Sequence, residues 1–159
     1  MKFRATLSSI VIVASSISMV GQDQSTGPKD TFAASKLSAA EIHDIVAETE
    51  KSAYDFPDSW VAELRVKRVD LGATTGIVVR GSNLLCGATA NCQTWVFRKV
   101  GNHLVSLFEG EQAPIAESFR FEAHTTAGIK DLTIRANSSA EAVTSVTYAF
   151  DGHFYRPKK

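Results

Sequence analysis

The spacing of apolar residues changes once along this chain, from a helical period before Pro57 to a period of two after it. Before Pro57, one stretch repeats its apolar residues every three to four positions, as a helix with one buried face does. After Pro57, apolar and polar residues alternate in short runs that turn residues separate, as in half-buried strands. Parallel strands need long crossover connections, usually helical, and no second stretch has a convincing helical period. The sequence therefore predicts one helix followed by a mostly antiparallel sheet.

The helix is predicted over residues 39–53, and Pro57 prevents its continuation. Ser38 and Glu41 match the capping-box pattern S-x-x-E, which marks a helix N-terminus. Leu37 precedes the box at the position of a hydrophobic staple, where it would pack against the first apolar residue of the helix. The apolar stripe of this helix consists of Ile42, Ile45, Val46 and Ala53. We expect this stripe to pack on the sheet.

Seven to eight short strands are expected, mostly in hairpin order. The clearest runs lie at residues 60–67, 74–81, 93–100, 103–110, 117–123, 129–136 and 142–150. The dipeptide Asp151-Gly152 stands between aromatic residues and predicts a last hairpin. The expected fold class is therefore α+β and mainly β, with the N-terminal amphipathic helix packed on a strongly twisted antiparallel sheet. That sheet either curls into a barrel-like form or splits into two sheets.

The first of these runs has an irregular alternation. Its apolar residues change parity between Val66 and Val69. An extra residue in one strand shifts the side chains that follow it to the other face. We interpret the change as a β-bulge near Lys67 or Arg68.

The first 21 residues have the composition of a secretory signal peptide. Lys2 and Arg4 form a short positive region, and an uncharged, mostly apolar stretch follows over residues 7–20. This stretch is shorter than the roughly 20 apolar residues that a membrane-spanning helix needs. We therefore expect residues 1–21 to be a signal peptide and the protein to be periplasmic or secreted.

The rest of the chain has the length of one domain. Residues 22–36 are small and polar and predict a disordered leader, and residues 37–159 predict a single α+β domain. Without Lys2 and Arg4, 15 basic residues remain against 17 acidic ones, a net charge near −2. The sequence shows no basic stripe, so nucleic acid is not an expected partner. We also expect no membrane span.

Cys86 and Cys92 are the only two cysteines, with five residues between them. In an exported protein we expect them to form a disulfide; a metal site, a redox pair or free thiols are the alternatives. Zinc needs three or four protein ligands, and redox pairs are normally C-x-x-C. A bridge over so short a loop adds modest stability, so we expect it to hold the shape of the loop. That loop is either a pinned hairpin or a recognition element that presents Thr89 and Asn91.

No residue pattern identifies a catalytic centre, a metal site or a cofactor, and we expect none of the three. The four histidines are scattered, and each has the setting of a solvated surface residue: His43, His103, His124 and His153. Glu109 and Glu111 flank Gly110 as an acidic pair in a predicted loop. These two glutamates complete the candidate binding residues.

The segment from Cys86 to Tyr155 resembles a group of small secreted bacterial proteins to which no activity is assigned. The shared features are a short cysteine loop, the run TWVFR at residues 94–98, the pair Asp131-Leu132 in a strand, and a closing hairpin Y-x-F-D-G-x-x-Y at residues 148–155. The resemblance implies export and a β-rich fold. It implies no catalytic residue.

These observations favour an exported, non-enzymatic binding or interaction protein of the bacterial envelope, such as an inhibitor or an immunity-type factor. Its expected partner is another protein, and a small ligand is the alternative partner. Two other functions stay open from the sequence. One is a carrier of a small apolar molecule inside a curled sheet. The other is a small hydrolase whose residues converge only in the folded chain.

Overall fold

The computed structural model describes residues 32–33, 36–49, 61, 64–81, 85–87, 90–109, 113–139 and 142–159. Within these ranges the chain forms one helix and ten strands. In chain order they are β1 (Phe32–Ala33), α1 (Ala39–Thr49), β2 (Arg65–Asp70), β3 (Thr75–Arg80), β4 (Cys92–Val100), β5 (His103–Ser106), β6 (Ile115–Ala116), β7 (Ser118–Thr126), β8 (Ile129–Asn137), β9 (Val143–Phe150) and β10 (Tyr155–Pro157).

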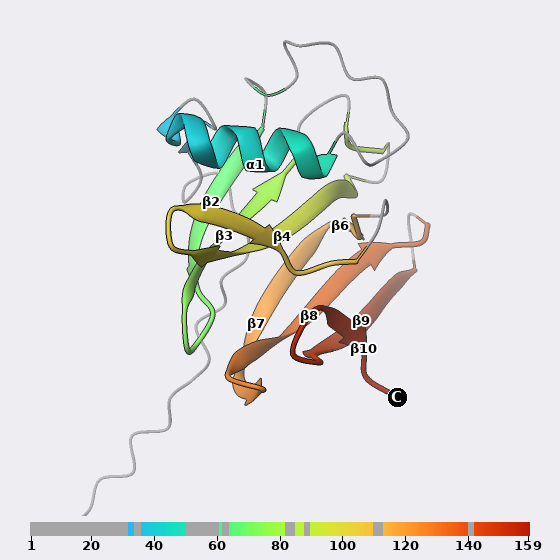
Figure 1. Cartoon of the computed structure of the whole chain (residues 1–159). Coiled ribbons are helices and arrows are strands. Elements are labelled where there is room, and N and C mark those ends of the chain that lie inside the picture. The colour runs from blue at the N-terminus through green and yellow to red at the C-terminus, as the bar shows by residue number, and fades with distance from the viewer. Residues whose placement is uncertain are drawn as a thin grey trace, which may run out of the picture.

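These elements are arranged in three layers (Figure 1). Helix α1 forms the first layer. The middle layer is a six-stranded sheet in the order β1-β2-β3-β4-β5, with β6 also paired to β4, and the third is a four-stranded sheet in the order β10-β9-β8-β7. The strand pairs of both sheets are antiparallel. The predicted antiparallel β-rich fold with one helix is confirmed, and the barrel-like alternative is wrong, because the described strands form two open sheets.

Helix α1 begins where the capping box predicts. The Ser38 backbone N–H and hydroxyl each donate to Glu41 Oε2 at 2.9 Å, and the Glu41 N–H donates to Ser38 Oγ at 3.3 Å. Ile45 is buried, and Leu37 and Ile42 pack in the same apolar cluster, as the predicted staple requires. Residues 50–53, the end of the predicted helix, lie outside the described residues.

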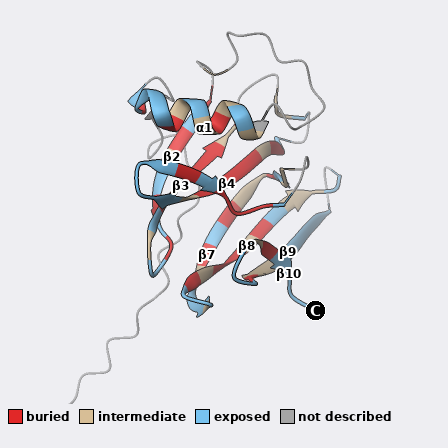
Figure 2. Cartoon of the chain, in the orientation of Figure 1, coloured by how far each residue is buried: buried red, intermediate tan, exposed pale blue. Residues whose placement is uncertain are grey.

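The middle sheet is buried on both faces, so its strands belong to two different cores (Figure 2). Val66 faces the core under α1, whereas Val69 faces the core shared with the four-stranded sheet. The pairing of β2 with β3 is unbroken along the whole strand. The predicted bulge near Lys67 or Arg68 is therefore wrong: the apolar parity changes because β2 buries one face and then the other. The register shift lies instead in β7, between Phe121 and Thr125.

The two sheets are joined where the β2–β3 turn meets the β7–β8 turn. The Ala73 N–H donates to the carbonyl of Gly128 at 2.9 Å, and the Lys130 N–H donates to the carbonyl of Leu71 at 2.8 Å. Gly72 has a positive φ of 98°, and a Cβ placed there would lie 2.8 Å from the Gly128 oxygen. A glycine is therefore required at this close approach of the two turns.

The predicted strands occur in the predicted order, with two changes of bounds and two additions: β2 begins at Arg65 and not at residue 60, and β5 ends at Ser106 and not at residue 110. The last hairpin forms at the predicted turn, where Asp151 Oδ1 accepts the N–H groups of His153 and Phe154. Strand β1 pairs with β2 inside the stretch that the sequence assigned to a leader, so the fold extends further toward the N-terminus than predicted. Strand β6 has only two residues, too few to show an alternation.

Candidate functional site

Cys86 and Cys92 are joined by a disulfide, as predicted. Within the loop that they close, the Gly87 N–H donates to the Asn91 carbonyl at 2.8 Å, and the Ala90 N–H donates to the Gly87 carbonyl at 3.0 Å. The guanidinium of Arg80 in β3 also donates to the Ala90 carbonyl, at 3.1 Å. The described part of this loop is therefore fixed by the bridge and by its own backbone, as expected for an element held in one shape.

Asn91 has a structural role in this loop. Its Nδ2 donates to the Asn137 carbonyl at 2.6 Å, and its Oδ1 accepts the Asn137 N–H at 2.9 Å. The side chain is largely buried and fastens the cysteine loop to the end of β8. Replacing Asn91 would therefore change the stability of the fold as well as any binding. Thr89, the other candidate in the loop, lies outside the described residues.

The acidic pair in the loop after β5 is described only in part. Glu109 forms an ion pair with Arg156, which also contacts Asp151 at 3.0 Å. Glu111 lies outside the described residues. The described glutamate thus connects its loop to β10 and the last hairpin.

The histidines are exposed, as predicted, but three of them contact buried or partly buried carboxylates, and the contacts of His103 and His124 are the shorter ones. His103 Nδ1 lies 3.3 Å from both carboxylate oxygens of Asp44 in α1, and one of those oxygens also accepts the Leu104 N–H at 2.8 Å. His124 Nδ1 lies 2.7 Å from Asp131 Oδ2. The first contact fastens the helix to β5, and the second belongs to a larger cluster on the four-stranded sheet.

Asp131 is the centre of that cluster. Its side chain is 1% exposed and accepts hydrogen bonds from Lys158 Nζ at 2.6 Å and from Thr126 Oγ1 at 2.7 Å, in addition to the contact with His124. A buried carboxylate with three donors needs no further role to explain it. We assign the cluster to the attachment of the segment after β10, because Lys158 follows β10 directly.

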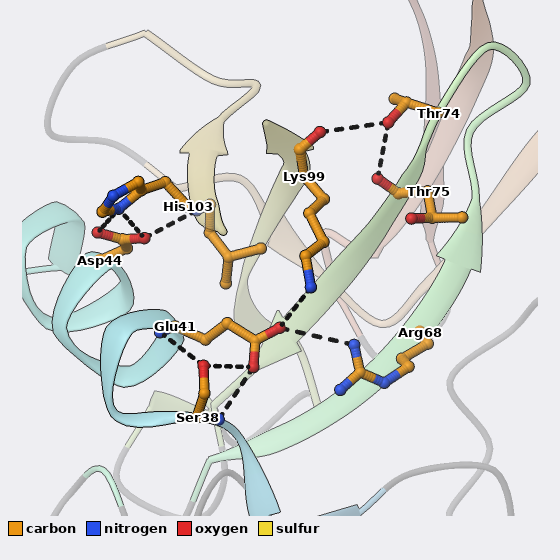
Figure 3. A network of polar contacts seen from close by, with 9 residues as sticks. Ser38, Glu41, Asp44, Arg68, Thr74, Thr75, Lys99 and His103 are labelled. Carbon is orange, nitrogen blue, oxygen red and sulfur yellow. Dashed lines mark hydrogen bonds and ion pairs between the residues drawn. The ribbon is translucent and has the colours of Figure 1, made fainter. Parts of the chain in front are cut away.

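A hollow lies on the helix-facing side of the middle sheet, beside the N-terminus of α1 (Figure 3). Its volume is about 290 Å³. Buried aliphatic side chains form much of its lining, including Ile77 of β3 and Leu104 of β5, and Thr75 adds a hydroxyl group. Alternation along β2 and β4 places Arg68 and Lys99 on the same side of the sheet.

Three charged side chains meet at the helix end of this hollow (Figure 3). Glu41 uses Oε2 in the capping box, so only Oε1 is left to face the sheet. Oε1 is buried and accepts no hydrogen bond, and it lies 3.6 Å from Arg68 Nη1 and 3.7 Å from Lys99 Nζ. These distances exceed the 2.7–2.9 Å that is usual for a charged hydrogen bond. The two cations are therefore near the carboxylate without being bonded to Oε1.

Glu41 stays ionised in this setting. Burial raises the pKa of its carboxyl, but the hydrogen bonds from Ser38 and the charges of Arg68 and Lys99 outweigh that effect and leave the pKa below its usual value. The helix end of the hollow thus contains one carboxylate and two cations at neutral pH, and the carboxylate of Asp70 is also part of the lining.

A second groove, of about 450 Å³, lies on the outer face of the four-stranded sheet. Its polar side chains bond to one another: Arg120 donates to Glu122 at 2.8 Å, Thr133 donates to Glu122 at 2.6 Å, and the hydroxyl groups of Thr133 and Thr147 lie 3.0 Å apart. We therefore regard the hollow beside α1 as the better candidate, because of the two it alone is lined by a buried acceptor without a hydrogen bond, Glu41 Oε1.

Sequence reasoning did not find this hollow. Glu41 was identified only as part of the capping box, and Arg68 only as one of two positions for a β-bulge. The available signal was the concentration of positive charge in residues 65–68 of a strand that the helix covers in part. Lys99 comes from another strand, and only the sheet register brings it to Glu41.

Among the described residues, no group of three histidine, cysteine, aspartate or glutamate side chains lies close enough together to hold a metal ion. The described part of the chain contains no helix that is long and apolar enough to cross a membrane. No protein-family model, no curated protein and no solved structure matches the chain.

Proposed function

We propose that this chain is an exported, non-enzymatic binding protein of the bacterial envelope and that the hollow beside α1 is its binding site. The observation that carries the proposal is the buried Glu41 Oε1, which has no hydrogen bond and lies between two cations at the edge of an apolar-lined hollow. Buried polar atoms are nearly always bonded, so an exception needs an explanation, and a bound molecule is one such explanation.

Export is supported by the signal-like residues 1–21 and by the disulfide. Disulfides persist in oxidising compartments and are rare in the cytosol. The bridge between Cys86 and Cys92 is compatible with a location outside the cytoplasm.

A binding role is favoured over the two other functions considered. The space between the sheets is occupied by core side chains such as Phe108, Phe121 and Leu132, which gives no support to a carrier with its ligand there. His124 and Asp131 are the arrangement closest to a hydrolase, but Lys158 and Thr126 bond to the same carboxylate and explain its burial. The cysteine loop that contains Thr89 is the second candidate contact, for a protein partner.

The test is a comparison of two immobilised proteins with a deproteinised extract of bacterial envelope. One is the mature wild type, and the other carries Arg68→Gln and Lys99→Met, which remove both cations of the hollow. Molecules released by denaturation are identified by mass spectrometry. We expect at least one compound to be enriched on the wild type and absent from the double variant. Equal recovery from both proteins, or no recovery from either, would refute the proposed site.

A further inference from the structure

We infer that the ligand of the hollow is a small primary carboxamide with a short aliphatic body. This inference rests on the proposed function of the hollow as a binding site. It follows from the hydrogen-bond donor that Glu41 lacks, from the position of Lys99, and from the lining and the size of the hollow.

The ligand has to bring a hydrogen-bond donor to Glu41. Oε1 of this side chain is buried and accepts no hydrogen bond. A donor placed against it would remove the cost of leaving a buried acceptor unbonded. A carboxylate ligand has no such donor and would add a second negative charge beside Glu41, so an anion does not suit this end of the hollow.

The donor should be neutral, and an acceptor should accompany it. Lys99 Nζ lies 3.7 Å from Glu41 Oε1 and, within the described part of the chain, donates no hydrogen bond. An alkylammonium ligand bonded to Oε1 would meet this cation at close range, and like charges repel. A neutral ligand with an acceptor gives Lys99 a partner as well. The Lys99 side chain is 41% exposed and flexible, so its ammonium can move to admit the ligand.

The separation of these two protein atoms favours a primary amide over other neutral groups. The nitrogen and oxygen of an amide lie side by side, about 2.2 Å apart, because its bonds measure about 1.33 and 1.23 Å. Hydrogen bonds of about 2.9 Å need to spread only slightly to reach Oε1 and Nζ from there. One hydroxyl oxygen bonded to both atoms would see them at an angle of about 80°, well below the tetrahedral angle. In a trans peptide group the N–H and C=O point in opposite directions, so one peptide group cannot pair with both atoms.

The lining and the volume favour a short aliphatic body on the amide. Ile77 and Leu104 line the hollow with buried aliphatic side chains, so an alkyl group placed against them leaves water for an apolar surface. Ligand sites usually measure roughly 300–1,000 Å³, and this hollow, at about 290 Å³, lies at the lower end. The pose places the amide between Glu41 and Lys99 and the alkyl chain against Ile77 and Leu104.

The inference is tested by NMR titration of the mature protein with five probes. Butyramide has both the amide and the alkyl chain. Pentan-2-one replaces the NH₂ group of butyramide by a methyl group, butyrate replaces it by an oxygen, butan-1-ol offers a hydroxyl alone, and acetamide lacks the longer chain. We expect saturable shifts from butyramide at the amides of Thr75, Ile77 and Leu104. The other four probes should bind at least tenfold more weakly, because each lacks the paired donor and acceptor or the alkyl chain.

Glu41→Gln is the decisive variant, because it should reverse the order of two probes. Glutamine also suits a capping box at this position, and its single oxygen is required by the two donors of Ser38. Its NH₂ group then faces the hollow, which presents a donor where the wild type presents an acceptor. We expect butyrate to bind this variant more tightly than butyramide does. Glu48→Gln makes the same change about two turns further along α1, outside the lining of the hollow, and should keep the wild-type order.

The outcomes separate the inference from the proposed function. If any of the other four probes binds the wild type as well as butyramide, if no probe binds, or if Glu41→Gln keeps the wild-type order, the assigned ligand class is wrong. The binding function would then still stand on the compound that the wild type enriches from envelope extract, and both are wrong if the extract also yields nothing. If Glu41→Gln does not fold, the order of the five probes on the wild type decides the question alone.

Discussion

Replacing Asp131 by asparagine tests whether one buried carboxylate holds the segment after β10 on the four-stranded sheet. A hydrogen bond to a charged group contributes roughly 1.5–3 kcal/mol net. Asparagine keeps one oxygen, which can still accept from Thr126, but its NH₂ group cannot accept from Lys158 or His124. Those two donors are 44% and 69% exposed and can bond to water instead. We therefore expect Asp131→Asn to lower the free energy of unfolding by about 2–4 kcal/mol.

The effect should depend on pH in a defined direction. Burial raises the pKa of the Asp131 carboxyl, but the hydrogen bonds from Lys158, Thr126 and His124 outweigh it and leave the pKa below the usual 3.8. A carboxyl with a lowered pKa in the folded state stabilises the protein above its unfolded pKa, and this stability is lost as the pH falls through the folded pKa. The difference between wild type and variant should be full at pH 7 and should shrink only below about pH 4.

The assay is urea unfolding followed by the fluorescence of the buried Trp95, at pH 7 and at several values below pH 4. Asp70→Asn is the matched control, because Asp70 also bonds to a lysine but is 62% exposed. An exposed ion pair contributes about 0–1 kcal/mol, so this control should unfold nearly as the wild type does. If Asp131→Asn lost no more stability than Asp70→Asn, the role assigned to the cluster would be refuted.

Three further predictions concern the helix, the disulfide and export. Ile45→Asp should cost on the order of 3 kcal/mol, because it buries an unpaired charge under α1; an unchanged melting temperature would show that the helix is not packed. The double change Cys86→Ser and Cys92→Ser should fold with a loss of about 1–3 kcal/mol in urea unfolding, and failure to fold would contradict a bridge of local importance. N-terminal sequencing of exported protein should find a start within residues 17–26, and a protein that retained Met1 would contradict the signal peptide.

Most of the fold could be predicted because its signals are local. The capping box at Ser38 fixes the start of α1, and the Asp151-Gly152 turn fixes the last hairpin. The parity change after Val66 was interpreted as a β-bulge, which is wrong. The sequence indicates that an apolar residue is buried, but it does not indicate which layer covers that residue. A strand covered on both faces and a bulged strand can have the same pattern.

The candidate site could not be predicted because it depends on contacts between distant segments. Glu41 has an evident local function as a cap, and its second oxygen becomes relevant only when β2 and β4 are in register beneath the helix. Asn91 was predicted as a recognition residue of the cysteine loop, and the structure shows its side chain bonded to the backbone of Asn137, on another sheet. A hydrogen bond to a backbone group does not depend on the residue type of the partner, so the sequence cannot predict it.

The two-sided burial of the middle sheet has a consequence for how the protein unfolds. Val78 follows Ile77 directly in β3, yet the two side chains belong to different cores. Opening this strand therefore breaks both cores at once, and detaching either outer layer would expose one apolar face of the sheet that remains. Among the described residues the two cores have no side chain in common, but the stabilities of the helix and of the four-stranded sheet are coupled through alternate residues of the same strands. We therefore expect the domain to unfold in one cooperative transition, in which α1 and the four-stranded sheet do not unfold separately.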